Sequence, residues 1–329
     1  MPKMLHRIFV HNTGKKLILV LSILFLIVLS GCKGSSSNKS ITDEDVRKGF
    51  DGLAMAFIKN APADKVFEQS IFPIGIELKN KGASDIQKGF LVLGFEKEYA
   101  DAVAGEAKET FDIKGKSIFN LNGDEEFMTL NAQAKKVGSQ SETHPSTILA
   151  TACYPYKTIL GTSVCIDTDI FGKQLRKKAC LAKDLEFGNG QGAPITITKV
   201  EVRMLPNADN DPTKVIPHFI IYIENKGNGE AVAEEKVEDV CSKKPLGFKD
   251  FNKVTIKASL SDKELNCNSG ETEKAESRLR EKKDIVRCTL AEGIASNRDA
   301  FVSPLKIELA YGYTFTISKD ITIEKILTY

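Results

Sequence analysis

The sequence predicts an all-β protein in which two antiparallel β-sandwiches follow one another after an N-terminal signal or anchor segment. Three observations predict this fold class. The chain has 329 residues, which is long for one domain. Phe, Ile and Val are frequent, Trp is absent, and Pro and Gly interrupt the chain at short intervals, as is typical of many short strands. One sequence unit also occurs twice at a spacing of about 150 residues, which indicates a domain duplication and not a solenoid.

The first 31 residues have the composition of an export signal. Basic residues precede an apolar run, Leu17–Leu29, and two small residues then stand before Cys32. The run of about 13 residues is shorter than the roughly 20 that a transmembrane helix needs. We therefore expect a cleaved signal peptide at 1–31. The alternative is an uncleaved signal anchor in which Cys32 has no special role.

The four residues Leu29-Ser30-Gly31-Cys32 resemble the lipobox of prokaryotic lipoproteins. In that family the cysteine thiol is lipidated and the chain is cut just before it. The resemblance implies that Cys32 is lipidated, that membrane lipid is one partner, and that the protein lies at the extracytoplasmic face of the cell membrane. Residues 33–40 are small and polar and are expected to form a tether. Thr42 and the acidic residues after it predict a short helix, so that 32–50 forms a tether and helix.

The repeated unit begins with an alternating strand that ends in Asn-Lys-Gly. Residues 72–82 are FPIGIELKNKG, and residues 217–227 are PHFIIYIENKG. We expect the glycine to supply the positive φ that turns the chain into the next strand.

The ends of the two units also agree, since Tyr154-Pro155-Tyr156 in 148–166 corresponds to Tyr311-Gly312-Tyr313 in 305–323. Each end is predicted to be a closing hairpin, with polar turns at Thr162-Ser163 and at Lys319-Asp320. The predicted domains are then 51–187 and 195–329, joined by a glycine-rich linker at 188–194.

Strand candidates with turn signals between them favour immunoglobulin-like sandwiches in both halves. Each half resembles, over its first strands, CARDB and related immunoglobulin-like modules of prokaryotic surface proteins. The matching segments are 53–67 and 74–86 in the first half and 197–206 and 220–232 in the second. The chain is also similar to uncharacterised archaeal lipoproteins with two such modules. Three segments carry this similarity: CYPYKT at 153–158, VCID at 164–167 and GQGAPITITKVE at 190–201. These families are mostly adhesive, stalk-like or of unknown role, so the resemblance implies no catalytic activity.

Six cysteines follow the export signal, and an even number in an exported chain predicts disulfides, although fifteen connectivities are open. Cys267 and Cys288 flank a polar excursion, and Cys165 and Cys180 flank another. In the repeat alignment Cys153 does not lie opposite Cys165. The predicted pairs are Cys267–Cys288, Cys165–Cys180 and Cys153–Cys241. No C-x-x-C pair is present, which disfavours a zinc or thioredoxin-type redox site.

The balanced charge and the absence of catalytic or metal-binding motifs argue against nucleic-acid binding, catalysis and metal binding. Lys and Arg number 46 against 44 Asp and Glu, so no nucleic-acid surface is indicated. His144 and His218 have no cysteine or histidine at ligand spacing, and no serine or cysteine has the setting of a nucleophile elbow. No catalytic residue, metal site or cofactor is predicted.

Two weaker binding signals remain. Acidic clusters at Asp124–Glu126, Asp167–Asp169 and 207–211 offer oxygen ligands for calcium, but solvated turns are the favoured interpretation. The tyrosine pairs offer a stacking surface for carbohydrate, but alternating aromatic residues more often pack across strands.

The leading hypothesis is a membrane-anchored, non-catalytic adhesion or envelope-structural module that contacts a protein or surface polymer. The alternative is a ligand-capture or receptor subunit of a membrane complex, which a deep apolar pocket near 188–194 would favour. A third hypothesis is an enzyme whose site is assembled from distant residues, which clustered side chains with shifted pKa values in a cleft would favour.

Overall fold

The computed structural model describes residues 42–103, 107–173, 175, 177–207, 211–242, 244–269 and 275–326. Thr42–Tyr329 forms one compact unit by itself. The predicted signal peptide, Cys32 and the tether up to residue 41 lie outside the described residues.

The N-terminal half starts at a capping box in which Thr42 and Asp45 bond each other's backbone, as expected from the sequence, and the helix ends at Val46. Its elements, in chain order, are α2 (Asp43–Val46), β1 (Leu53–Phe57), β2 (Lys65–Phe67), β3 (Ile71–Asn80), β4 (Ile86–Gly94), β5 (Ala100–Ala102), β6 (Lys108–Ile113), β7 (Glu125–Ala134) and β8 (Thr143–Ile166).

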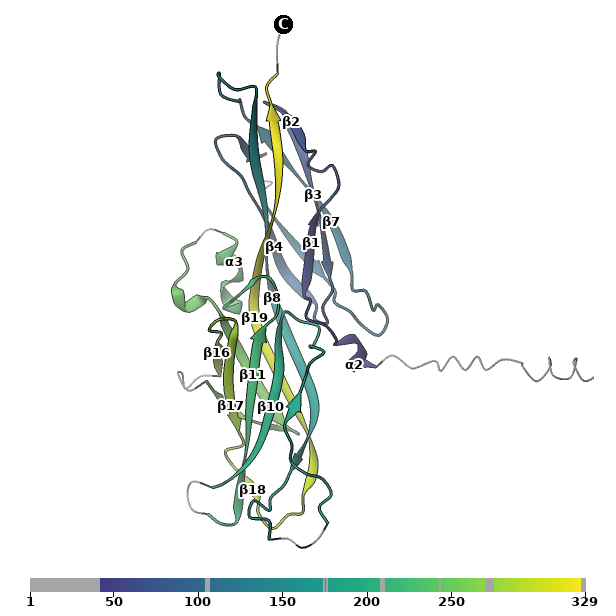
Figure 1. Cartoon of the computed structure of the whole chain (residues 1–329), viewed down its shortest axis with the longest axis vertical. Helices are drawn as coiled ribbons and strands as arrows, with labels where there is room; N and C mark the ends of the chain where they lie inside the picture. Colours follow the sequence, from purple (N-terminus) through teal and green to yellow (C-terminus); the bar gives the residue numbers. More distant parts are fainter. Residues whose placement is uncertain are drawn as a thin grey trace, which may run out of the picture. The chain divides into compact units, whose positions relative to one another are not determined.

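The C-terminal half combines long and very short strands with a small helical segment that lies near the junction of the two halves (Figure 1). Its elements are β9 (Leu185–Glu186), β10 (Ile195–Pro206), β11 (Lys214–Asn225), β12 (Glu230–Val232), η1 (Glu234–Lys236), α3 (Val237–Val240), η2 (Phe248–Asp250), β13 (Lys253–Leu260), β14 (Lys263–Glu264), β15 (Asn266–Asn268), β16 (Glu276–Arg278), β17 (Lys283–Thr289), β18 (Ile294–Ala295) and β19 (Phe301–Glu324).

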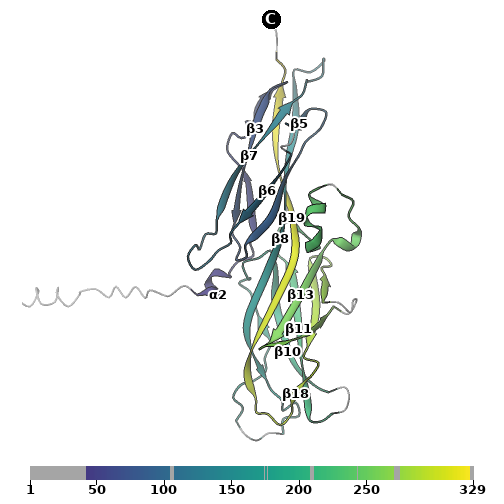
Figure 2. The same ribbon diagram turned by 180° about the vertical axis from the view of Figure 1, so that it is seen from behind.

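Three sheets build the unit. A four-stranded sheet of order β1-β3-β7-β5 belongs to the N-terminal half, and a sheet of order β15-β17-β11-β10-β9 belongs to the C-terminal half. The third sheet, β14-β13-β19-β8-β4-β6, takes strands from both halves. In Figures 1 and 2, β8 and β19 run side by side through both halves. All paired strands are antiparallel except β2, which pairs with the end of β19 in parallel.

The long strands correct the predicted hairpins. β8 and β19 are each 24 residues long and pair with each other without a break, from Phe301 opposite Ile166 to Glu324 opposite Thr143. The expected turn at Lys319-Asp320 lies inside β19, opposite Ile148 and Thr147, and Thr162-Ser163 lies inside β8. These polar residues stand at outward or partly exposed positions of a continuous alternation, because a partner strand is present along the whole length.

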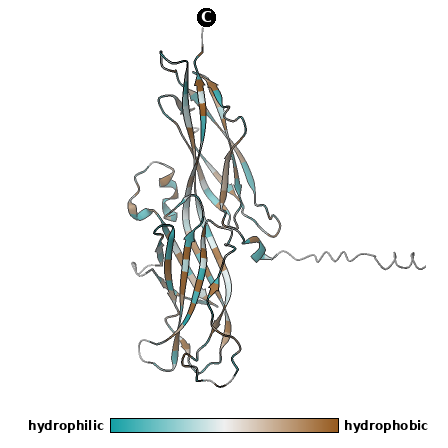
Figure 3. Ribbon diagram, viewed as in Figure 1, coloured by the Kyte–Doolittle hydropathy of each residue, from teal (hydrophilic) through white to brown (hydrophobic). Residues whose placement is uncertain are grey.

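Inward side chains from both halves form a continuous apolar core. In Figure 3, hydrophobic and hydrophilic residues alternate along the strands, as a sheet with one buried face requires. The predicted all-β class is confirmed. The division into two immunoglobulin-like domains at 188–194 remains a prediction, since the third sheet is shared by both halves.

Candidate functional site

Four tyrosines meet where the two long strands pass from one half to the other, and we call this region the waist. Tyr154 lies opposite Tyr313, and Tyr156 lies opposite Tyr311. All four side chains are buried, with ring centroids of neighbours 5.7 to 6.3 Å apart. The rings therefore pack across the strands, and the alternative of an exposed carbohydrate-stacking surface is wrong.

Tyr156, Asn80, Gly82 and Ser84 form what we call the N-terminal node. The Tyr156 hydroxyl donates to Asn80 Oδ1 (3.2 Å) and accepts from the Ser84 N–H (3.4 Å). Asn80 Oδ1 also accepts from the Gly82 N–H (3.1 Å). Asn80 Nδ2 donates to the carbonyls of Ser84 (2.8 Å) and Ile113 (3.2 Å). The asparagine thus closes its own turn and ties this turn to β6.

The same arrangement recurs in the C-terminal node, which consists of Tyr313, Asn225, Gly227 and Gly229. The Tyr313 hydroxyl donates to Asn225 Oδ1 (3.1 Å) and accepts from the Gly229 N–H (2.9 Å). Asn225 Oδ1 accepts from the Gly227 N–H (3.0 Å), and Asn225 Nδ2 donates to the Gly229 carbonyl (2.9 Å). Equivalent residues of the sequence repeat therefore make equivalent hydrogen bonds.

The glycine of each Asn-Lys-Gly ending is needed for close packing, and not for the positive φ that the sequence analysis expects. Neither Gly82 nor Gly227 is among the residues with positive φ. A Cβ atom on Gly82 would lie 1.8 Å from the Tyr156 hydroxyl oxygen, and one on Gly227 would lie 2.2 Å from that of Tyr313. The tyrosine hydroxyls occupy the space that a side chain would need.

The remaining two hydroxyls hold the first residues of β1 and β10. Tyr154 accepts from the Leu53 N–H (3.3 Å), and Tyr311 accepts from the Ile195 N–H (3.4 Å). Burial raises the pKa of Tyr313 to about 12 and raises the pKa values of the other three tyrosines as well. The phenols stay neutral near pH 7 and act as hydrogen-bonding groups of the waist.

The predicted linker 188–194 is packed into the waist. The Gly49 N–H donates to the Asn189 carbonyl (2.7 Å), and the Gly192 N–H donates to the Gly49 carbonyl (2.8 Å). Gln191 is buried and accepts from the Ile197 N–H (2.8 Å). These bonds fasten the entry of the chain, just after α2, to the segment between the halves.

A cleft of about 750 Å³ lies beside this segment. Its lining mixes charged residues with apolar ones. It includes Asp43, Glu44, Arg47, Lys48, Glu186 and Lys306, residues 188–191, and the apolar Ile159, Leu160 and Phe187. Ion pairs join Arg47 to Asp43 (2.7 Å) and Lys48 to Asp45 (2.6 Å). This lining differs from the deep apolar pocket that the ligand-capture hypothesis requires.

The six downstream cysteines form three disulfides, in the pairs that the sequence analysis predicts. The S–S distances are 2.05 Å for Cys153–Cys241, 2.00 Å for Cys165–Cys180 and 2.03 Å for Cys267–Cys288. Cys267 and Cys288 lie directly opposite each other on β15 and β17. Cys153–Cys241 fastens the end of α3 to β8.

The two downstream histidines lie apart and take part in ordinary packing. His144 stacks on Tyr99, with ring centroids 3.4 Å apart, and its Nε2 lies 3.5 Å from a Glu96 carboxylate oxygen. Burial and the nearby Arg287 lower the pKa of His218, which stands on β11.

The fold brings two of the acidic clusters to one depression, which Asp169, Asn207 and Asp211 help to line. Lys178 forms ion pairs with Asp167 (2.7 Å) and Asp169 (3.3 Å). Asp124 accepts from Asn120 in a separate loop. Among the described residues, no group of three or more His, Cys, Asp or Glu side chains is arranged to hold a metal ion.

Exposed aromatic side chains that the sequence motifs do not single out lie in two loops and in η2. Phe119, Phe171 and Phe248 are 92%, 70% and 84% exposed. Phe119 stands in an apolar run between Gly115 and Gly123, which is a signal that a search for apolar residues in loops would find.

No protein-family model matches this chain, and no curated protein is significantly similar to it. Within the described residues, the structure contains no helix with the length and apolar character needed to cross a membrane.

Proposed function

We propose that this chain is a cell-surface lipoprotein, anchored through Cys32, that acts as a non-catalytic adhesion, envelope-structural or protein-interaction module. The observation that carries the proposal is the unbroken pairing of β8 with β19 over 24 residues, braced at the waist by the tyrosine nodes. At about 3.3 Å per residue, such a pair extends over roughly 80 Å. A rigid pair of this length, with the entry of the chain packed at its waist, offers extended contact surfaces at the outer face of the membrane that holds Cys32.

The disulfides and the polar interior agree with this role. Three structural disulfides are expected in an oxidising compartment outside the cytoplasm. Every buried side-chain nitrogen or oxygen in the described part of the chain has a hydrogen-bond partner. The buried hydroxyls of the waist are used to hold backbone, which supports a structural role.

Intact-mass measurement of the protein from the membrane fraction tests the anchor. We expect loss of residues 1–31, added lipid mass on Cys32 and loss of the six thiol hydrogens that three disulfides remove. Cys32→Ser is the matched control, and it should yield an unlipidated chain. A full-length, unmodified precursor with free thiols would contradict the proposal.

Cross-linking on intact cells tests the mode of action. An adhesion or envelope role predicts cross-links from the folded unit to another envelope protein or to a surface polymer. Native mass spectrometry of the purified protein supplies the opposing result: a bound small molecule would favour the ligand-capture alternative.

A further inference from the structure

The loop that joins β6 to β7 carries an apolar tip on its outside. Ile118, Phe119 and Leu121 are 50%, 92% and 46% exposed. The tip, residues 117–122, has the sequence SIFNLN and contains no charged side chain. Large apolar side chains grouped at the end of a loop are a common feature of surfaces that contact a lipid or a protein.

The base of this loop is fixed to the fold. The Lys116 N–H donates to the Gly82 carbonyl (2.7 Å), and the Gly115 N–H donates to Asp85 Oδ1 (2.9 Å). Gly123 has φ +70°, and a Cβ atom there would lie 1.8 Å from the Asn80 carbonyl oxygen. The N-terminal node thus holds the base of the loop.

The tip itself is closed by a short turn. The Ser117 N–H donates to the Asn120 carbonyl (2.8 Å), and the Asn120 N–H donates back to the Ser117 carbonyl (3.2 Å). This turn holds Ile118 and Phe119 away from the core. Presentation of the apolar side chains is therefore built into the loop.

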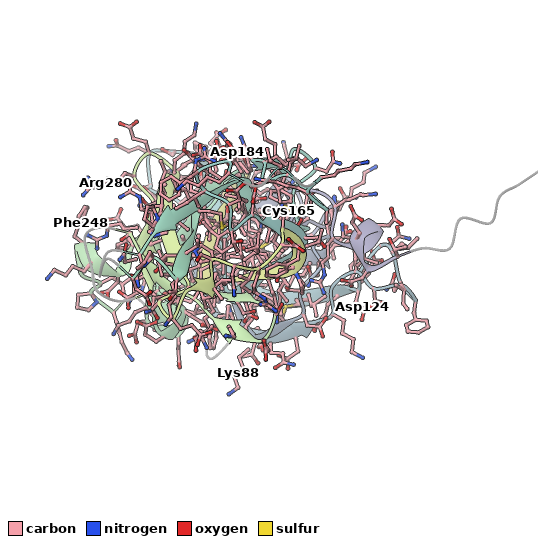
Figure 4. The ribbon with its side chains drawn as sticks, turned by 90° about the horizontal axis from the view of Figure 1, so that it is seen from below. Lys88, Asp124, Cys165, Asp184, Phe248 and Arg280 are labelled. Atoms are coloured by element: carbon pink, nitrogen blue, oxygen red, sulfur yellow. A yellow bond between two sulfur atoms is a disulfide. The ribbon has the colours of Figure 1, made fainter. Side chains whose placement is uncertain are left out.

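The loop lies next to the point where the chain enters the fold. Lys116 Nζ donates to the Lys48 carbonyl (2.7 Å), two residues after the helix α2 ends. In Figures 1 and 2 the β6–β7 loop lies beside α2 in both views, and in Figure 4 the labelled Asp124 of this loop is next to the same helix.

The length of chain before this point limits how far the fold can lie from an anchored Cys32. Residues 33–42 number ten, and ten residues reach at most about 35 Å even when fully extended. A lipid on Cys32 would therefore hold Thr42 within about 35 Å of the bilayer, and the β6–β7 loop contacts the chain only six residues after Thr42, at Lys48.

We propose that the apolar tip formed by Ile118, Phe119 and Leu121 inserts into the interface of the membrane that holds the Cys32 lipid. This inference rests on the proposed lipidation and adds a second point of attachment to it. Charges of both signs, Lys114 and Asp124 among them, flank the uncharged tip. Insertion therefore depends on apolar burial and requires no anionic lipid.

The absence of tryptophan from the chain gives a direct experiment. Phe119→Trp places a single tryptophan at the tip of the full-length lipidated protein, which is then reconstituted into phosphatidylcholine vesicles. We expect blue-shifted emission and quenching by brominated lipid.

Phe248→Trp is the matched control, because Phe248, at the start of η2, is also an exposed phenylalanine and lies on the opposite side of the unit in Figure 4. Its emission should remain that of a water-exposed indole. Adding Ile118→Asp to Phe119→Trp should reduce the quenching, since a charge at the tip opposes insertion.

The outcomes separate the two proposals. If the vesicle-bound protein gives the same emission from Phe119→Trp and Phe248→Trp, the inserted tip is overturned and the anchor stands. If the protein does not bind vesicles and its mass shows no lipid on Cys32, the proposed anchor fails.

Discussion

The N-terminal and C-terminal nodes of the waist can be compared bond by bond. Asn80 has a hydrogen bond to the Ile113 carbonyl that Asn225 lacks, and Tyr156 has one to the Gly192 carbonyl (3.4 Å) that Tyr313 lacks. The two hydrogen bonds of Tyr313 are shorter than those of Tyr156. In the N-terminal half the asparagine also ties the node to β6, next to the β6–β7 loop. In the C-terminal half the tyrosine holds the Gly229 N–H. The same motif therefore makes more hydrogen bonds in the N-terminal half and shorter tyrosine hydrogen bonds in the C-terminal half.

The halves also differ in their covalent connections, and here the largest effect is expected. Cys153–Cys241 spans 88 residues and fastens α3 to β8, whereas Cys267–Cys288 spans 21 residues within the C-terminal half. Replacing both cysteines of the first pair by alanine should lower the free energy of unfolding by about 4.5 kcal/mol, against about 3 kcal/mol for the second. Denaturant unfolding of the two variants checks this, and equal losses would contradict the order.

The second largest loss of stability is expected from substitution of the two node asparagines, Asn80 and Asn225. Asn80→Ala leaves the Gly82 N–H, the Tyr156 hydroxyl and two carbonyls without this partner, so a loss of about 3 kcal/mol is expected. Asn225→Ala removes one bond fewer and should cost about 2 kcal/mol. Thermal unfolding of both variants measures the difference. A larger loss for Asn225→Ala would show that the additional bond of Asn80 contributes little.

The tyrosines should show the reverse order. Tyr313→Phe leaves the Gly229 N–H without its 2.9 Å acceptor, and we expect a loss of about 2 kcal/mol. Tyr156→Phe removes three bonds, but all are longer (3.2 to 3.4 Å), and it should cost about 1 kcal/mol. The phenyl ring is retained in both variants, so the packing of the waist serves as an internal control. The same order for asparagines and tyrosines would contradict the comparison.

The smallest expected difference between the two nodes is in how stability depends on pH above about pH 10. Burial raises the pKa of Tyr313 from 10.0 to about 12 in the folded state. Because the folded state holds the proton more tightly, this contribution to stability is complete below pH 10 and is lost as the pH rises towards about 12. The pKa of Tyr156 is raised further, so its contribution continues to fall at higher pH. Urea unfolding at a series of alkaline pH values should give a shallower slope for Tyr313→Phe than for the unsubstituted protein.

The sequence predicts the repeat and the all-β class, because alternation and the Asn-Lys-Gly endings are local patterns. It marks the asparagines and tyrosines as repeated motifs, but it does not predict that they meet in the nodes. It does not predict that β8 and β19 continue through the waist. A period of two residues fits one long strand as well as two short ones, and Thr162-Ser163 is a weak turn signal. Only a partner strand far away in sequence decides between them.

The role of the glycines was missed for a similar reason. Gly82 is required by the hydroxyl of Tyr156, which lies more than 70 residues further along the chain. Local turn chemistry carries no information about that approach. The apolar tip at Phe119 was missed because it belongs neither to the Asn-Lys-Gly endings nor to the tyrosine pairs that define the repeat.

The unbroken alternation along β8 has a consequence for how this protein can change during evolution. Even-numbered residues from Ser146 to Leu160 are all buried, on both sides of Tyr154. Deleting or adding one residue near the waist would turn the core side chains of one half outwards and point its solvent-facing residues inwards. A length change in the two long strands therefore requires a β-bulge, as between β10 and β11 near Ile197, whereas connections between elements, such as the segment around α3, accept it without one.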